Sequence, residues 1–133
     1  MNLKAKGSKA ERELLHLFWE AGWACTRTAG SGSTTRPAPD LLAGNGEIVL
    51  ALECKAFSGS NKYFEKNEIE QLETFSNIFG AESRIAIKFS RKPWYFVKIA
   101  DLKNSGKNFG INLKLCEEKG QKFEELTSND RKI

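Results

Sequence analysis

Residues 39–55, PDLLAGNGEIVLALECK, decide the fold of this chain. Gly44-Asn45-Gly46 separates two apolar runs, and an Asn-Gly pair in that position is a strong signal for a β-hairpin. The sequence therefore predicts one strand over residues 40–43 and a second over residues 47–55, joined by a turn around Asn45.

The second predicted strand has two chemically different faces. Its apolar residues Ile48, Leu50, Leu52 and Cys54 alternate with residues that include Glu53 and Lys55. Successive side chains of a strand point to opposite faces, so Glu53 and Lys55 project together from the face opposite the apolar set. A carboxylate and an ammonium are thus expected side by side at the carboxyl end of a strand, where α/β sheets favour functional sites.

Asp40 and Glu53 are the predicted centre of a metal-dependent phosphodiesterase site. Phosphodiester hydrolysis needs a metal to neutralise the phosphate and acidify water, and Mg²⁺ prefers carboxylate and water oxygens. The backbone carbonyl of Cys54 is a third candidate ligand, and Lys55 can position the attacking water or stabilise the transition state. His16 is the only histidine and the three cysteines form no CxxC pair, which excludes zinc sites built on several imidazoles or thiolates.

A simple hairpin centred on Asn45 does not bring the two carboxylates together. It places Asp40 opposite Leu50, three residues short of Glu53, which is about 10 Å at ~3.3 Å per strand residue. Shared coordination of one cation then requires a bulge, a kink after Pro39 or strand twist. The sequence leaves these three alternatives open.

Helices are predicted before and after the hairpin. Ser8 and Glu11 fit the N-cap and N3 positions of a capping box, and Gly22 is expected to end this first helix. A second helix is expected over residues 65–79, stopped by Gly80.

The remaining segments complete an α/β fold with a central mixed sheet. Strands are predicted at 23–28, 84–89 and 94–97, with a further short strand within 109–116, and residues 29–36 form a glycine-rich loop. This order indicates a single domain, residues 1–133, in which helices flank the sheet. Residues 117–133 are charged and weakly patterned, and they are predicted to be a frayed helix or a disordered tail.

The charge distribution favours an enzyme that acts on nucleic acid. The formal net charge is +4 and the pI about 9.0. Cations dominate residues 84–107, whereas residues 40–83 are acidic on balance, and these two charges suit phosphates and a metal ion respectively. No apolar run is long enough to cross a bilayer and no signal peptide precedes the first helix, so a cytoplasmic protein with reduced thiols is expected.

Several stretches together resemble the archaeal Holliday junction resolvases, the Hjc family of the PD-(D/E)XK nuclease superfamily. They are residues 6–14 (KGSKAEREL), 27–33 (RTAGSGS), 39–43 (PDLLA) and 52–55 (LECK), and Gln71. Residues 104–133 contribute no matching motif. The resemblance implies a restriction-endonuclease-like α/β core.

The resemblance also implies a homodimeric endodeoxyribonuclease that makes paired symmetric nicks across a four-way DNA junction in homologous recombination and DNA repair. Mg²⁺ is the expected cofactor, with Mn²⁺ able to substitute. The implied active-site residues are Glu11, Asp40, Glu53, Lys55 and Ser31. The expected metal ligands are Glu11, Asp40, Glu53 and the carbonyl of Cys54. The expected DNA contacts are Lys6, Arg12, Arg27, Ser31, Arg36 and Gln71, of which Arg36 is included for its charge and its place at the end of the loop.

Some of these residues keep a structural alternative. Glu11 is either an active-site residue or the capping-box partner of Ser8. Gln71 is either functional or a helix-surface amide, and Ser31 is either a DNA contact or part of a flexible loop. The aromatic residues between Phe64 and Phe96 are expected mostly in the core, with the remainder available for an apolar dimer interface.

Two other functions compete with junction resolution. One is a nuclease with the same core and another DNA substrate, and the other is a junction-binding protein without catalysis that uses only the basic surface. A recombination or replication protein as a further partner stays open, because no motif identifies one.

Overall fold

The computed structural model describes residues 3–28 and 36–128 of the chain. The helices and strands, in chain order, are α1 (Leu3–Glu20), β1 (Ala24–Arg27), β2 (Leu41–Gly44), β3 (Val49–Phe57), β4 (Asn61–Glu65), α2 (Lys66–Phe79), β5 (Glu82–Phe89), β6 (Trp94–Val97), the 3₁₀ turn η2 (Ile99–Asp101), β7 (Lys103–Asn104), β8 (Asn108–Asn112), α3 (Leu113–Lys119), β9 (Gln121–Lys122) and α4 (Phe123–Thr127).

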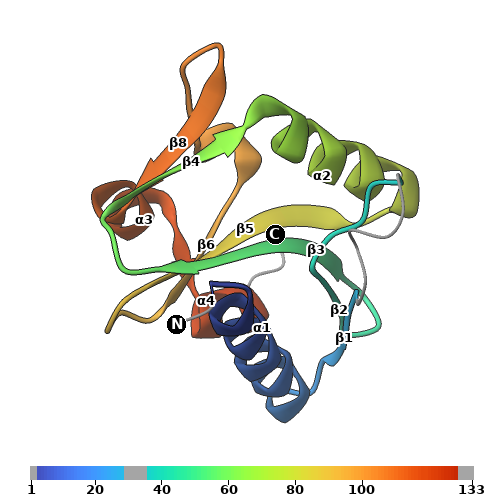
Figure 1. Ribbon diagram of the computed structural model, residues 1–133. Helices are drawn as coiled ribbons and strands as arrows, with labels where there is room; N and C mark the ends of the chain where they lie inside the picture. Colours follow the sequence, from blue (N-terminus) through green and yellow to red (C-terminus); the bar gives the residue numbers. More distant parts are fainter. Residues whose placement is uncertain (1–2, 29–35, 129–133) are drawn as a thin grey trace.

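A six-stranded sheet in the order β1-β2-β3-β5-β6-β9 forms the centre of the molecule. The pairing of β3 with β5 is parallel and the other neighbours are antiparallel, so the sheet is mixed. Helices α1 and α4 cover one face, and α2 and α3 cover the other together with a small sheet of β4, β8 and β7 (Figure 1). The expected α/β fold with a central mixed sheet flanked by helices is confirmed.

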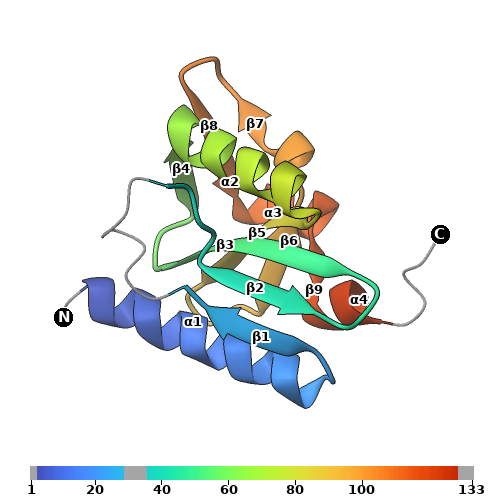
Figure 2. The ribbon, with the colours of Figure 1, turned by 90° about the vertical axis from the view of Figure 1, so that its right-hand side faces the viewer.

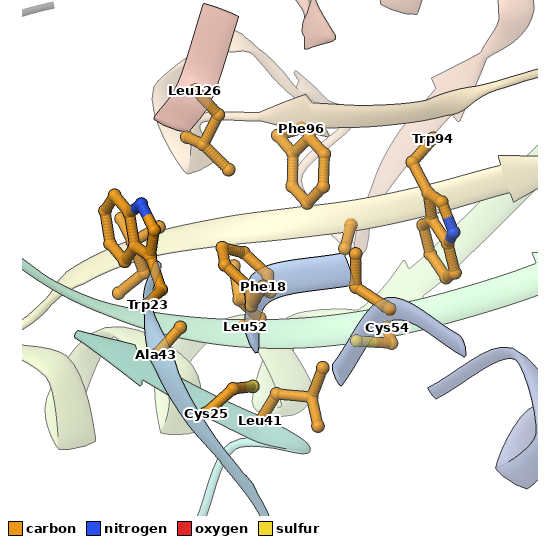
Figure 3. Close-up of a cluster of buried hydrophobic side chains, with 13 residues drawn as sticks. Phe18, Trp23, Cys25, Leu41, Ala43, Leu52, Cys54, Trp94, Phe96 and Leu126 are labelled. Atoms are coloured by element: carbon orange, nitrogen blue, oxygen red, sulfur yellow. The ribbon is translucent and has the colours of Figure 1, made fainter. Parts of the chain in front are cut away.

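The alternation predicted for β3 is also confirmed. Leu50, Leu52 and Cys54 are buried in a cluster with Phe18 of α1, on the face that α1 covers (Figure 3). Ala51 belongs to the cluster on the opposite face, where α2 packs. Because side chains alternate along a strand, Glu53 and Lys55 share the α2 face with Ala51.

The predicted turn at Asn45 is present, but it is longer than a simple hairpin turn. The pairing Gly44↔Val49 leaves the four residues 45–48 in the loop. The Asn45 side chain accepts hydrogen bonds from the backbone N–H groups of Glu47 and Ile48 (2.9 and 2.8 Å), and Gly46 adopts a φ of +95°. The strand pairing is therefore shifted by three residues from the simple hairpin, with Leu41 opposite Leu52.

The predicted start of the first helix is wrong. Helix α1 begins at Leu3, so Ser8 and Glu11 lie inside the helix and not at its N-terminus. Residues 3–6 include Leu, Lys and Ala, which are good helix formers, and they extend the helix past the expected cap. The predicted end is confirmed, since Gly22 has a φ of +88° immediately after the last turn.

Three segments contain more regular structure than predicted. Residues 56–63, between the predicted strand and the second helix, hold the end of β3 and most of β4, and the strand expected within 109–116 is β8 followed by α3. Within the predicted tail, residues 117–128 include β9, which pairs with β6, and α4, whose Leu126 is fully buried against the core. Apolar contacts made by single residues such as Leu126 and Phe123 stabilise this segment, and they leave little periodic pattern in the sequence.

Most of the aromatic residues expected in the core are buried there. Phe64, Phe89, Trp94, Tyr95 and Phe96 are buried, and all three cysteines are buried and free. Among the described residues, no helix is long and apolar enough to span a membrane.

Candidate active site

Charged residues from three layers of the fold meet where β2 begins and β3 nears its carboxyl end. The first turn of α2, the N-terminal half of α1, the start of β2 and the end of β3 lie on the same side of the molecule, at the left of Figure 2. The sheet divides this region into a part on the α2 face and a part on the α1 face.

Asp40 is held in place by backbone hydrogen bonds on both sides. Its N–H donates to the Leu52 carbonyl at 2.9 Å, and its own carbonyl accepts from the Thr28 N–H at 2.9 Å. Since Leu41 also pairs with Leu52, two residues of one strand face a single residue of the other, which is the arrangement of a β-bulge. The Asp40 carboxylate then accepts the Cys54 N–H at 2.8 Å.

These contacts explain how Asp40 reaches Glu53. The longer turn supplies the three-residue shift that the simple hairpin lacked, and the bulge turns the Asp40 side chain toward the Glu53–Cys54 peptide. Of the three alternatives that the sequence left open, the bulge is the one observed, and it acts together with the turn.

Burial and neighbouring negative charge raise the pKa values of both carboxyl groups. Burial is the largest cause of the rise of the Glu53 pKa to about 8, followed by the negative charge of Asp40, and Lys55 opposes it. The pKa of Asp40 is also raised by burial and by the charge of Glu11, against the lowering effect of the Cys54 N–H, Lys55 and Arg27. Two poorly solvated carboxylates side by side favour any cation that can compensate them.

Lys55 forms an ion pair with a residue that the sequence analysis did not single out. Its Nζ lies 3.8 Å from Oε1 of Glu68, which belongs to the first turn of α2. The other Glu68 oxygen accepts the backbone N–H of Glu65 at 3.0 Å, as in a capping box. The signal was present in the sequence, because a Glu three residues after a helix boundary suggests this geometry, but the boundary was not placed sharply enough to use it.

On the α1 face, Glu11 and Arg27 form a close ion pair. Arg27 Nε donates to Glu11 Oε1 at 2.7 Å, and its Nη2 donates to the Ser8 hydroxyl at 2.9 Å. The capping-box alternative for Glu11 is therefore wrong, since Ser8 and Glu11 both contact Arg27 from within the helix. Glu11 is near enough to the α2-face pair for its charge to raise the pKa values of Asp40 and Glu53.

Within residues 3–28 and 36–128, no group of three or more His, Cys, Asp and Glu side chains is arranged to hold a metal ion. Asp40 and Glu53 are brought together, whereas Glu11 is turned toward Arg27. Cys54 has its side chain in the core and its N–H on Asp40, and burial raises the pKa of its thiol well above the usual value. The chemistry of the donors, two neighbouring carboxylates whose charge Lys55 offsets only in part, fits a hard divalent cation.

The expected DNA contacts are distributed around this region. Arg12, Arg36 and Gln71 are exposed, and Gln71 lies one helical turn after Glu68 on α2. Ser31 lies outside the described residues, and so does the side chain of Lys6.

Comparisons with known proteins place the chain in a family. The sequence model described as archaeal Holliday junction resolvase (Hjc) matches residues 2–133. The crossover junction endodeoxyribonuclease Hjc of Archaeoglobus fulgidus is 42% identical over 130 residues, which cover 92% of this chain and 96% of that protein. The protein of the same name from Methanocaldococcus jannaschii is 41% identical over 107 residues, 80% of this chain and 76% of that protein.

A solved structure shows the same fold. The structure of Archaeoglobus fulgidus Hjc, described as a Holliday junction resolvase from an archaeal hyperthermophile, superposes with a TM-score of 0.86 at 38% identity, over 92% of this chain and 100% of that one. The match extends through the C-terminal segment for which the sequence offered no motif. On these grounds the chain belongs to the archaeal Holliday junction resolvase (Hjc) family.

Proposed function

We propose that this protein is a structure-selective endodeoxyribonuclease that resolves four-way DNA junctions by paired symmetric nicks, in homologous recombination and DNA repair in the cytoplasm. The observation that carries the proposal is the meeting of Asp40 and Glu53 beside Lys55, in a chain whose relatives are named crossover junction endodeoxyribonucleases. A protein that only binds junctions gains nothing from two half-buried carboxylates beside phosphate.

Mg²⁺ is the proposed cofactor, with Mn²⁺ as a substitute. Asp40, Glu53 and the carbonyl of Cys54 would hold it, and when bound it would supply charge neutralisation and an acidified water. The Cys54 N–H fixes one oxygen of Asp40 at 2.8 Å, which orients the carboxylate before any cation arrives. Lys55 projects from the same face of β3 as Glu53, so its ammonium lies where it can orient water or stabilise negative charge on the phosphate.

Arg27 has a double role in this proposal. In the DNA-free protein its guanidinium compensates Glu11. A DNA phosphate offers the same fork of acceptors as a carboxylate, so it competes for Arg27 and releases Glu11 toward Asp40 and Glu53. Glu11 would thereby join the ligand set only when substrate is present.

A homodimer is proposed on the basis of an apolar surface. Trp19, Ile78 and Phe79 are 56%, 84% and 54% exposed, and Phe79 stacks on Phe75 at 5.1 Å. Trp19 and Phe79 also line a shallow apolar depression of about 360 Å³ over β1 and β2. A second copy is the proposed occupant, because twofold dimers are the commonest assembly and two symmetric nicks need two sites.

The dimer is tested by replacing Phe79 with Glu. A charge in an apolar interface is costly, so we expect a monomer in light scattering after size exclusion, with unchanged helix content. A Phe79→Glu protein that stays dimeric would contradict this placement of the interface.

The function is tested on a synthetic four-way junction, with each strand labelled in turn and the products resolved on a denaturing gel. We expect paired nicks on opposing strands with Mg²⁺, no cutting with EDTA, and little cutting of linear duplex. Equal cutting of duplex would favour a nuclease with another substrate. Junction binding without nicks would leave a binding protein and would remove the assigned catalytic roles.

A further inference from the structure

The first turn of α2 brings an additional acidic side chain to the active site. Glu68 lies three residues before Gln71 but belongs to none of the motifs that indicated a nuclease, and no motif assigns it a functional role. Its carboxylate lies 3.8 Å from the Lys55 ammonium, which projects from the same face of β3 as Glu53, and its negative charge adds to the raised pKa of Glu53.

The position of Glu68 is fixed by the fold. Helix α2 is anchored to the core through Ile69 and Leu72, which are 1% and 3% exposed. One Glu68 oxygen accepts the Glu65 N–H at 3.0 Å, which restricts the side chain to a conformation that follows the helix start. The second oxygen is then presented to β3 at a defined place.

Lys55 has the opposite character. A lysine side chain is a flexible four-carbon stem that ends in a compact charge, and it needs a partner to hold one position. Among the residues that the structure describes, Glu68 is the residue with which Lys55 forms an ion pair, at 3.8 Å. Both side chains are about one-third exposed, so the pair adds little to stability, but it restricts where the ammonium can lie.

We infer that Glu68 is a positioning residue that holds the Lys55 ammonium beside Glu53 for the reaction. The inference rests on the proposed function, since it gives Lys55 a role in phosphodiester hydrolysis. Glu68 acts through Lys55 and not on the substrate, so its removal lowers the rate of the chemical step without weakening junction binding.

Glu68→Gln separates the two contacts of this side chain. Glutamine has one carbonyl oxygen, which can still accept the Glu65 N–H and cap the helix. Its NH₂ group would then face Lys55, and two donors cannot hydrogen-bond to each other. The variant keeps the shape and the cap and removes only the contact with the ammonium.

The chain offers a matched control in α4. Glu125 accepts the backbone N–H of Lys122 at 2.8 Å, so it caps a second helix in the same way. Its helix lies on the other face of the sheet from α2 (Figure 1). Glu125→Gln therefore makes the same chemical change in a cap that does not contact the active site.

The test is single-turnover cleavage of a four-way junction by the full-length protein, with binding measured separately in EDTA. We expect Glu68→Gln to slow cleavage about tenfold with unchanged binding, because misplacing a catalytic group costs one to two orders of magnitude. Glu125→Gln should cut at the wild-type rate. Combined with Lys55→Ala, the Glu68→Gln change should add nothing, since the group it positions is gone.

Additive rate losses in the double variant, or a Glu68→Gln enzyme as fast as wild type, would overturn the role of Glu68. A second readout does not depend on cutting. In protein labelled with ¹³C at lysine Cε, the resonance that disappears in Lys55→Ala should shift in Glu68→Gln and stay in place in Glu125→Gln. An unshifted resonance would show that the ion pair does not hold Lys55. Wild-type protein that cuts no junction would instead overturn the proposed function itself.

Discussion

Charged residues lie on both faces of the central sheet near the end of β3, but their charges are compensated differently on the two faces. On the α1 face, Glu11 is already compensated by Arg27 at 2.7 Å, with Ser8 completing the contact. On the α2 face, Asp40 and Glu53 lie together, and burial is the largest cause of the raised pKa of each, with the charge of Glu11 adding to the rise for Asp40 and the charge of Asp40 to the rise for Glu53. Glu11 is thus paired with a cation on the α1 face, whereas on the α2 face Lys55 only partly offsets Asp40, Glu53 and Glu68, and this excess of carboxylates favours binding a cation there.

The largest expected effect comes from removing one charge on the α2 face. Glu53→Gln keeps the side-chain shape, so we expect folding and junction binding to survive while cleavage falls at least about a hundredfold, as for the loss of a metal-based catalyst. Single-turnover assays with Mg²⁺ measure the rate, and gel-shift assays in EDTA measure binding. A Glu53→Gln protein that still cuts would show that the site is assigned wrongly.

Cleavage should be less sensitive to the loss of a charge on the α1 face, where Arg27 pairs with Glu11. Arg27→Met keeps much of the side-chain volume but removes the guanidinium proposed to hold a DNA phosphate, and we expect cleavage to fall about tenfold because the phosphate is less well oriented. Junction binding should also weaken with a smaller salt dependence, since one phosphate contact is lost. Unchanged binding at all salt concentrations would contradict the phosphate role of Arg27.

The two faces should also differ in their response to pH. Glu53 has an ordinary pKa near 4.5 when unfolded and about 8 in the folded, metal-free protein. Between these values the native state retains a proton that the unfolded state has lost. The contribution of Glu53 to the free energy of unfolding is therefore fully present below pH 4.5 and is lost as the pH rises through 8. Urea unfolding in EDTA should show this loss in wild type and a flatter profile in Glu53→Gln. A wild-type protein equally stable at pH 5 and pH 8 would contradict the raised pKa.

The smallest effect concerns the hydrogen bond that orients Asp40. In Asp40→Asn the amide oxygen can still accept the Cys54 N–H, whereas Asp40→Ala leaves this buried donor without a partner. We expect the Asn variant to be more stable than the Ala variant by about 1 kcal/mol in urea unfolding, the usual value of such a bond. Equal stability of the two variants would show that water replaces the carboxylate at no cost.

Periodic patterns predicted most of the central sheet. The alternation from Leu50 to Lys55 assigned Glu53 and Lys55 to the correct face, and the apolar runs located β2, β3, β5 and β6. Such patterns do not predict contacts between residues that are far apart in the sequence. The start of α1 was misplaced because Ser8 and Glu11 looked like a cap, and only the folded chain brings Arg27 to them.

The candidate site shows the same division. The sequence indicated which residue types form the site. It did not predict that Asp40 and Glu53 lie together, because this depends on a four-residue turn and a bulge that differ from a simple hairpin only in local hydrogen bonds. Glu68 was missed because its contact with Lys55 joins two elements whose relative position no local pattern specifies. The short strand β9 was missed, and the tail left open between a frayed helix and disorder is packed on the core as α4, because its contacts come from a few residues such as Phe123 and Leu126.

The most direct test of the account is a calorimetric titration of the DNA-free protein with Mn²⁺ at pH 7.5, repeated in buffers with different ionisation enthalpies. Because Glu53 is largely protonated at this pH in the metal-free protein, cation binding should release protons. We predict proton release in wild type and in Glu11→Gln, and no proton release in Glu53→Gln. Binding without proton release in wild type, or the same release in Glu53→Gln, would contradict a cation site on the α2 face.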